Sequence, residues 1–349
     1  MRIGIVTSAP AEGLLSGTAA AVAGLRGGLV ALGHEVVTLR PQGPPRGSLL
    51  VHRLLFNLAL SRALATLSTD LLVGVGLDGF LWARRQRLAP YVVLLRELVA
   101  DRFNGGSRFL RSLQARLEAG NAQRADGVVV PSQHVREAVR RRYGVAPERL
   151  RVVPEGINLA RWRAPAPSAG DGATILCAVP RSGDAAGAEF VQAFAIVHRA
   201  LPSARAVLVS DHAARPGSGE KAERLGLSGA VLERAVTDEE TLRACYQAAD
   251  LFCLPRASAA ATPFFLAAMA SGLPIVATTD KAVPEVVPSA AGILVPPGNI
   301  EALAEALIAL LGAPARRSEM GSAGLQAVAA HDWPVVARGF IEELERPAR

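Results

Sequence analysis

Short apolar segments alternate with helical segments along the whole of this 349-residue chain. This alternation constrains the fold strongly, because a strand, a covering helix and a further strand build a parallel sheet. In the first half we expect strands at 2–7, 34–39, 71–75, 91–95, 127–130 and 150–153. In the second half we expect them at 174–179, 204–210, 231–232, 251–254, 275–277 and 293–295. The sequence therefore predicts an α/β protein with two parallel sheets.

A segment crowded with Pro, Gly and Ser separates the two series of strands. Residues 164–172 read APAPSAGDG, a composition that disfavours regular structure and is typical of a linker. Half of the residues are hydrophobic (50%), which is enough to bury two cores in a chain of this length. We therefore expect an N-terminal domain at 1–163, a linker at 164–172 and a C-terminal domain at 173–330, followed by a terminal helix at 331–349.

Composition and spacing exclude several classes of protein. No run of about 18 uncharged apolar residues is present, and the opening MRIGIVTSAP is typical of a buried strand rather than a signal peptide. The scattered Cys177, Cys245 and Cys253 indicate buried, reduced thiols in a cytoplasmic protein. No spacing of cysteines or histidines suits a metal, so neither a metal nor another cofactor is expected.

The positive charge is concentrated in the first half of the chain. The net charge is +7, but residues 1–163 carry +12 and the remainder carries −5. This asymmetry predicts an anionic partner for the N-terminal domain, either a membrane surface or a phosphorylated acceptor, with the cluster Arg84–Arg85–Arg87 and the arginines of a helix at 107–124 as contacts. The alternative is that these arginines are simply solvated faces. No nucleic-acid-binding module is recognisable, so nucleic acid is not expected as a partner.

Several motifs resemble those of the family 4 glycosyltransferases, which have the GT-B fold of two Rossmann-like domains facing across a cleft. They are SGTAAAVAGLRGGLVALGHEV near the start, NAQRADGVVVPSQHV before PEGIN, then AMASGLPIVAT, PEVV and GILVPPGN, and finally HDWPVVARGFIEEL. The resemblance covers nearly the whole chain. It implies a retaining transfer of sugar from a nucleotide-sugar donor, and a terminal helix that returns to the N-terminal domain.

The resemblance also implies where donor-binding residues stand. Ser16 and Gly17 occupy the glycine loop that approaches the donor phosphates, and Arg96 occupies the position of a histidine beside the transferred sugar. Arg181 keeps the phosphate-binding arginine, whereas Ala186 replaces the lysine that follows it. Two alternatives remain open: an ion pair of Arg96 with Glu97, and a merely surface position for Arg181.

The family's pair of donor-site glutamates is absent. Their positions, eight residues apart, are occupied by Ala259 and Ala267. Between them, Thr262-Pro263-Phe264-Phe265 has the form of an N-cap with a first-turn proline, so we expect Thr262, Phe264 and Phe265 to open a helix whose free amides attract phosphate. The alternative is a purely structural helix start.

Two functional hypotheses follow. The first is a glycosyltransferase of weak or lost turnover, acting from a nucleotide sugar on an unknown acceptor, in the cytoplasm or peripherally at the inner face of the membrane. The second is a non-catalytic GT-B protein that scaffolds an active glycosyltransferase or binds a nucleotide or glycan. Groups that neutralise a leaving diphosphate contribute much of the rate of such a transfer. The absence of the two carboxylates and the lysine therefore predicts a low rate of turnover.

Overall fold

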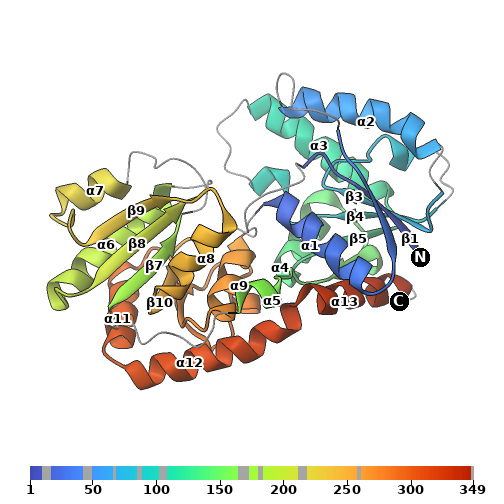
Figure 1. Ribbon diagram of the computed structural model, residues 1–349. Coiled ribbons are helices and arrows are strands. Elements are labelled where there is room, and N and C mark those ends of the chain that lie inside the picture. Colours follow the sequence, from blue (N-terminus) through green and yellow to red (C-terminus); the bar gives the residue numbers. More distant parts are fainter. Residues whose placement is uncertain are drawn as a thin grey trace. The chain divides into compact units, whose positions relative to one another are not determined.

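The structure is a computed structural model, and it describes residues 1–9, 17–41, 49–65, 68–84, 89–101, 108–163, 173–179, 184–210, 218–257 and 261–346. The chain forms two compact units, each with its own sheet (Figure 1). The first contains Thr18–Glu155 and the C-terminal segment from Trp333, together with the first strand. The second contains Gly156–Asp332. The predicted linker at 164–172 lies outside the described residues.

The sheet of the first unit has six parallel strands in the order β2-β1-β3-β4-β5-β6. Its strands are β1 (Arg2–Val6), β2 (Glu35–Leu39), β3 (Leu71–Val75), β4 (Tyr91–Leu94), β5 (Gly127–Val130) and β6 (Leu150–Val152). The strands β3 and β5 are buried along their whole length, as expected for central strands covered on both faces.

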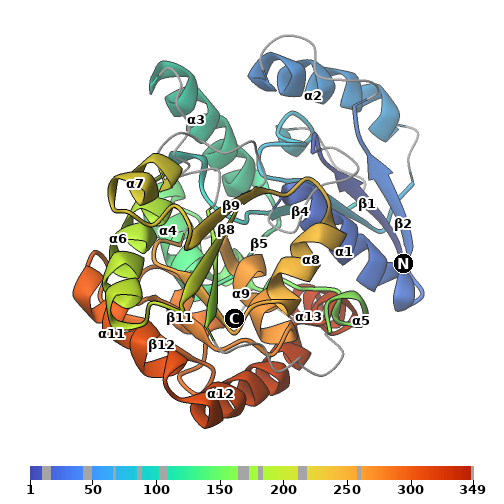
Figure 2. The ribbon, with the colours of Figure 1, turned by 60° about the vertical axis from the view of Figure 1, so that its left-hand side comes forward.

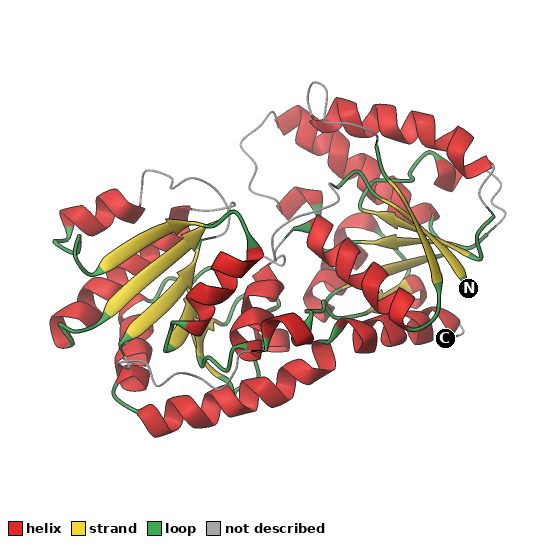
Figure 3. Ribbon diagram, viewed as in Figure 1, coloured by secondary structure: helices red, strands yellow, loops and turns green. Residues whose placement is uncertain are grey.

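Helices cover both faces of this sheet (Figure 3). They are α1 (Thr18–Ala31), α2 (Leu49–Ala65), α3 (Arg108–Arg124), α4 (Gln133–Tyr143) and α13 (Trp333–Glu345). Short 3₁₀ turns lie at Trp82–Arg84, Val99–Asp101 and Pro147–Arg149. Apolar side chains of α1 and α13 pack with those of the central strands to form the core of the unit, which includes Leu25, Leu29 and Phe340.

The second unit repeats the plan with the order β12-β11-β10-β7-β8-β9, again all parallel (Figure 2). Its strands are β7 (Thr174–Ala178), β8 (Arg205–Ser210), β9 (Val231–Ala235), β10 (Leu251–Leu254), β11 (Ile275–Thr278) and β12 (Gly292–Val295). Its helices are α5 (Leu159–Trp162), α6 (Asp184–Ala200), α7 (Ser218–Arg224), α8 (Glu239–Gln247), α9 (Thr262–Ala270), α10 (Val283–Val286), α11 (Ile300–Leu311) and α12 (Pro314–Ala327), with a 3₁₀ turn at Val328–His331. The α/β class and the two parallel sheets predicted from the sequence are confirmed.

The passage between the units differs from the sequence expectation, which ends the first domain at residue 163. Residues from Gly156 on already pack in the second unit. Trp162 is buried there, with its ring edge-on to Tyr246 at 5.5 Å between centroids and its indole N–H donated to Glu239 at 2.7 Å. The burial of this large aromatic side chain therefore accounts for the packing of the segment in the core of the second unit.

Two local expectations are wrong. Leu110, Leu113 and Leu117 have helical spacing in the sequence, which predicts that all three lie in the core. Leu110 is nevertheless exposed, because the inward face of α3 is formed by Glu118, Asn121 and Ala122. The strand at 231–232 extends to Ala235, because β9 is an edge strand whose exposed positions accept polar residues. No described helix is long and apolar enough to cross a membrane.

Candidate functional site

Each sheet reverses its strand order at one point, and this point marks the expected ligand site. In open α/β sheets ligands bind beyond the carboxyl ends of the strands where the order reverses. In the first unit the reversal lies between β1 and β3, and in the second it lies between β7 and β10. The segments that follow these four strands therefore form the candidate sites, which we describe separately.

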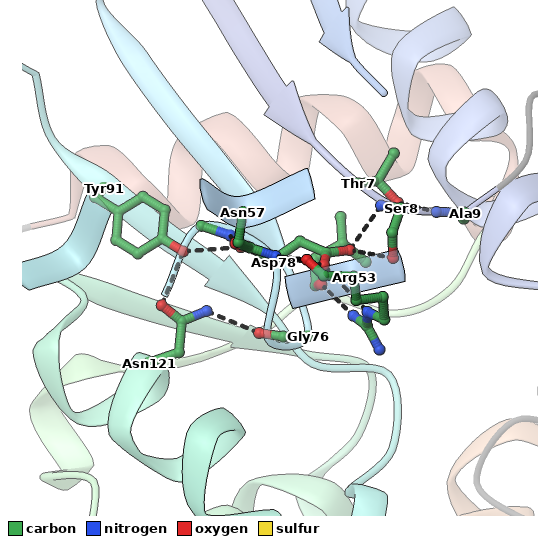
Figure 4. Close-up of polar contacts among 11 residues, drawn as sticks. Thr7, Ser8, Ala9, Arg53, Asn57, Gly76, Asp78, Tyr91 and Asn121 are labelled. Carbon is green, nitrogen blue, oxygen red and sulfur yellow. Dashed lines mark hydrogen bonds and ion pairs between the residues drawn. The ribbon is translucent and has the colours of Figure 1, made fainter. Parts of the chain in front are cut away.

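In the first unit a buried carboxylate bridges the reversal point (Figure 4). Asp78 follows β3 and is 1% exposed. Its Oδ2 accepts hydrogen bonds from the backbone N–H of Ser8, which follows β1, at 2.7 Å and from the Ser8 hydroxyl at 2.8 Å. Its Oδ1 accepts from Arg53 Nε at 3.1 Å and from Asn57 Nδ2 at 3.3 Å, both on α2. Asp78 thus joins two strand ends and a helix.

A second set of polar groups holds the turn that carries Asp78. The Tyr91 hydroxyl donates to the Asp78 carbonyl at 3.1 Å or to Asn121 Oδ1 at 2.9 Å, and Asn121 in turn donates to the Gly76 carbonyl at 2.8 Å (Figure 4). Gly79 has φ +95°, and a Cβ there would meet the Tyr91 hydroxyl at 2.5 Å. Hydrogen-bonded partners on every side make this turn a rigid support for the segment that leaves β1.

Arg96 forms a buried ion pair across the same sheet. It lies just beyond β4, and its guanidinium contacts the Glu155 carboxylate through Nε to Oε1 and through Nη2 to Oε2 at 3.0 Å. Both side chains are 6% exposed. Burial acts to lower the pKa of Arg96, but the Glu155 carboxylate, with a smaller contribution from Glu97, outweighs it and raises the pKa. The principal partner is therefore Glu155, 59 residues away, rather than the adjacent Glu97.

The Arg96–Glu155 pair lies at the wall of a small apolar cavity. The cavity is enclosed by the ends of β4 and β5 and by the first turns of α1 and α13, and its lining includes Leu25, Trp333 and Phe340. An arginine paired in this way remains a cation and is no general base. Arg96 thus presents chemistry different from that of a histidine at the same position.

In the second unit the helix after β10 is wholly buried. Every residue of α9 from Thr262 to Ala270 is buried, and Ala267 has no exposed surface. Thr262 is the first residue of the helix and not its N-cap, because Ala261 already has a helical backbone (φ −83°, ψ −8°) and offers no side chain to cap it. Phe264 and Phe265 belong to the core, which limits their contact with a ligand to the helix backbone.

The helix after β7 carries an alanine at the position where the resemblance implies a lysine. Ala186 lies near the start of α6 and is 3% exposed. Beyond the neighbouring strand, Arg256 pairs with Glu189 of α6 at 2.7 Å. Beyond β11, Asp280 accepts a hydrogen bond from the Thr278 hydroxyl at 2.7 Å. Arg256 and Asp280, which we did not single out from the sequence, are thus charged groups at this edge.

Some of the predicted site residues fall outside the described part of the chain. Ser16, Arg181 and Ala259 are among them, whereas Gly17 lies half-buried directly before α1. Within the described residues, no group of three or more His, Cys, Asp or Glu side chains could hold a metal ion. Cys177, Cys245 and Cys253 are free and buried.

Two family models together match most of the sequence. The model described as Glycosyltransferase Family 4 matches residues 15–161, and the model described as Glycosyl transferases group 1 matches residues 181–313. The chain belongs to the family 4 glycosyltransferases. Its two units correspond to the paired α/β domains of the GT-B fold.

Solved structures agree with the GT-B fold of this family 4 chain. A sucrose-phosphate synthase from Thermosynechococcus elongatus is similar with a TM-score of 0.77 and 21% identity, covering 98% of this chain and 97% of that one. Anabaena Alr3699/HepE, solved in complex with UDP and glucose, is similar with a TM-score of 0.73 and 17% identity, covering 99% of each chain.

Curated relatives match the family 4 chain over shorter stretches. A phosphatidyl-myo-inositol mannosyltransferase from Mycobacterium leprae is 33% identical over 138 residues, which are 38% of this chain and 37% of that protein. The chain spans less than half the length of the curated relatives it matches first.

Proposed function

We propose that this family 4 chain recognises a nucleoside diphosphate or nucleotide sugar beyond β7 and β10, and that its turnover of a sugar donor is weak or lost. The observation that carries this proposal is Ala267. It has no exposed surface and lies in an entirely buried helix, at the position where the resemblance implies a donor-site glutamate. A methyl group offers nothing to hold a sugar hydroxyl.

Binding would rely on the groups that remain. Arg181 comes shortly after β7 in the sequence, and the amino end of α9 comes after β10, the strand beside β7 in the sheet. An arginine and free helix amides both suit a phosphate. Pro263 has no N–H, which removes one donor from that helix end.

Catalysis would lack several groups at once. A retaining transfer needs the departing diphosphate to be neutralised, yet Ala186 carries no charge to assist Arg181. In the first unit Arg96 is paired with Glu155 and has no proton to exchange near neutral pH. Because such groups act together, their joint loss is expected to reduce the rate greatly.

The second candidate function is a non-catalytic GT-B protein that partners an active glycosyltransferase. The same alanines favour it, since a scaffold has no need for donor-site carboxylates. The two candidates differ in acceptor chemistry: the enzyme needs an acceptor, and the scaffold needs a protein partner. For the enzyme, a phosphorylated acceptor would suit the basic first unit.

Isothermal titration of the full chain with UDP, GDP and ADP tests nucleotide recognition. We expect saturable heat with at least one of them, and a several-fold weaker affinity in Arg181→Ala. The matched control is Arg199→Ala, an exposed arginine in the last turn of α6, which should leave the affinity unchanged. Absence of binding to all three, or equal effects of the two substitutions, would refute the nucleotide proposal.

A further inference from the structure

Arg256 carries a positive charge at the edge of the second sheet where the strand order reverses. It lies two residues beyond β10, whose neighbour in the sheet is β7. Its guanidinium Nε donates a hydrogen bond to Glu189 Oε1 of α6 at 2.7 Å. The Arg256 side chain is 55% exposed and the Glu189 side chain is 16% exposed. The pair thus joins the segment after one strand of the reversal point to the helix after the other.

The position of Glu189 on α6 brings this pair close to the missing cation. Ala186 and Glu189 are three residues apart, which makes them neighbours on one face of the helix. Because the Cα–Cβ bonds of a helix are tilted toward its amino end, the Glu189 side chain extends over the turn that contains Ala186. The guanidinium that binds this carboxylate is therefore held near the amino end of α6.

The core of the second unit fixes the backbone that carries Glu189. Phe190 and Phe194 of α6 are fully buried, and they belong to one apolar cluster with Cys177 of β7 and Cys253 of β10. The helix contacts both of these strands. Its distance from the two strand ends is therefore set by packing, and the Glu189 carboxylate offers a fixed anchor for a guanidinium.

A guanidinium can contact two anions at the same time. It carries five N–H donors in a planar fork, and the contact of Arg256 with Glu189 uses the Nε–H. More than half of the Arg256 side chain is exposed, so phosphate oxygens can reach it. Folding stability gives little reason for the arrangement, because exposed ion pairs contribute little to it.

We propose that Arg256 supplies the phosphate-binding cation that Ala186 does not, and that Glu189 positions it. The inference rests on the proposed function, since the ligand is the same nucleoside diphosphate beyond β7 and β10. It deepens that function by assigning a second cation beside Arg181, which comes from the segment after β10 rather than from α6. Arg256 is then a binding residue, whereas Glu189 acts only through Arg256.

The two partners of the pair are expected to affect binding in opposite directions. Arg256→Gln removes a cation that contacts the diphosphate, and it should weaken binding about tenfold. Glu189→Gln keeps an oxygen that accepts from Arg256 but removes a negative charge near the phosphates, and it should strengthen binding about threefold at low salt. A pair that merely held α6 to the segment after β10 would be weakened by both substitutions, which would then act in the same direction.

Isothermal titration of the full chain with UDP, GDP and ADP at low ionic strength is the test. It compares the native chain with Arg256→Gln, Arg256→Lys and Glu189→Gln. The matched control is Arg140→Gln, which removes the same charge from an arginine of similar exposure (51%) that pairs with Glu137 in the first unit. Circular dichroism melting confirms that each variant is folded.

For the nucleotide that binds best, we expect a weaker affinity in Arg256→Gln, a smaller loss in Arg256→Lys, a gain in Glu189→Gln and no change in the control. Unchanged affinity in Arg256→Gln, a loss shared with Glu189→Gln, or an equal loss in Arg140→Gln would overturn the inference. In those cases a loss of affinity in Arg181→Ala would still support the proposed function. If the native chain binds none of the three nucleotides, both fail.

Discussion

The indole of Trp333 lies directly against Gly24, so that a Cβ at Gly24 would come within 2.0 Å of the Trp333 ring. One turn further along α1, a Cβ on Gly28 would approach the Trp333 carbonyl oxygen at 2.4 Å. Two glycines four residues apart thus form the groove that receives the first turn of α13. This contact attaches the last helix of the chain to the first unit.

Gly24→Ala is therefore expected to destabilise the first unit. The added methyl meets a bulky ring in a packed interface, and overpacking of this kind typically costs about 1–3 kcal/mol. Gly27→Ala is the matched control, because a Cβ there meets nothing within 4 Å. Replacing that exposed helical glycine should stabilise the chain by about 0.5–1 kcal/mol.

Urea unfolding of the two variants measures both effects. Opposite signs for Gly24→Ala and Gly27→Ala confirm that the contact with Trp333, and not helix propensity, decides the outcome at Gly24. A stabilisation of similar size in both variants would show that α13 does not pack closely on α1.

The buried ion pair of Arg96 and Glu155 leads to a second prediction. Arg96→Met leaves the Glu155 carboxylate buried without its cation, and breaking a buried pair in this way costs about 3–5 kcal/mol. The double variant Arg96→Met/Glu155→Leu should recover most of that loss, because no unpaired charge remains.

Chemical denaturation of these variants tests that prediction, with Arg140→Met as a control. Arg140 pairs with Glu137 on the surface of α4 and should contribute no measurable stability. A single variant as stable as the native chain, or a double variant less stable than the single, would contradict a role for the pair in holding β4 to the segment after β6.

Two buried thiols lead to a prediction about pH. Cys177 and Cys253 are register partners on the adjacent parallel strands β7 and β10. Burial raises the pKa of both thiols, with a further contribution of Cys253 to the pKa of Cys177. The unfolded chain therefore loses these protons first, once the pH passes about 8.5.

The free energy of unfolding should consequently fall as the pH rises above about 8.5, by up to about 1.4 kcal/mol per pH unit for each thiol. Below that pH the thiols are protonated in both states and contribute no slope. Urea titrations between pH 7 and 9.5 under reducing conditions measure the slope. Cys177→Ala/Cys253→Ala should flatten it, and an equally steep fall in that variant would assign the effect to other groups.

Strands were predictable from the sequence because parallel strands buried on both faces are short apolar runs, as in LLVGV of β3 and GVVV of β5. The helix α2 was missed because it is apolar on its inward and outward faces, so its sequence lacks helical periodicity. The N-cap assigned to Thr262 was wrong because the helical turn begins one residue earlier, at Ala261.

Contacts between residues that are far apart in the chain could not be predicted from the sequence. Nothing local to Arg96 identifies Glu155 as its partner, and nothing local to Asp78 identifies Ser8, Arg53 and Asn57 as its donors. These contacts arise from strand order, which brings the ends of β1, β3, β4 and β6 to one edge of a sheet. Motifs could therefore be recognised from the sequence, whereas the partners of Arg96 and Asp78 follow only from the fold.

Turnover of nucleotide sugars by the purified full chain tests the central proposal most directly. UDP- and GDP-linked hexoses are incubated with the protein, and release of the nucleoside diphosphate is followed with and without added acceptor lipids. Because alanines stand at 186, 259 and 267, the proposal predicts release at the rate of a protein-free control or only slightly above it. Clear release of UDP or GDP by the native chain, abolished in Arg181→Ala, would contradict it and establish an active glycosyltransferase.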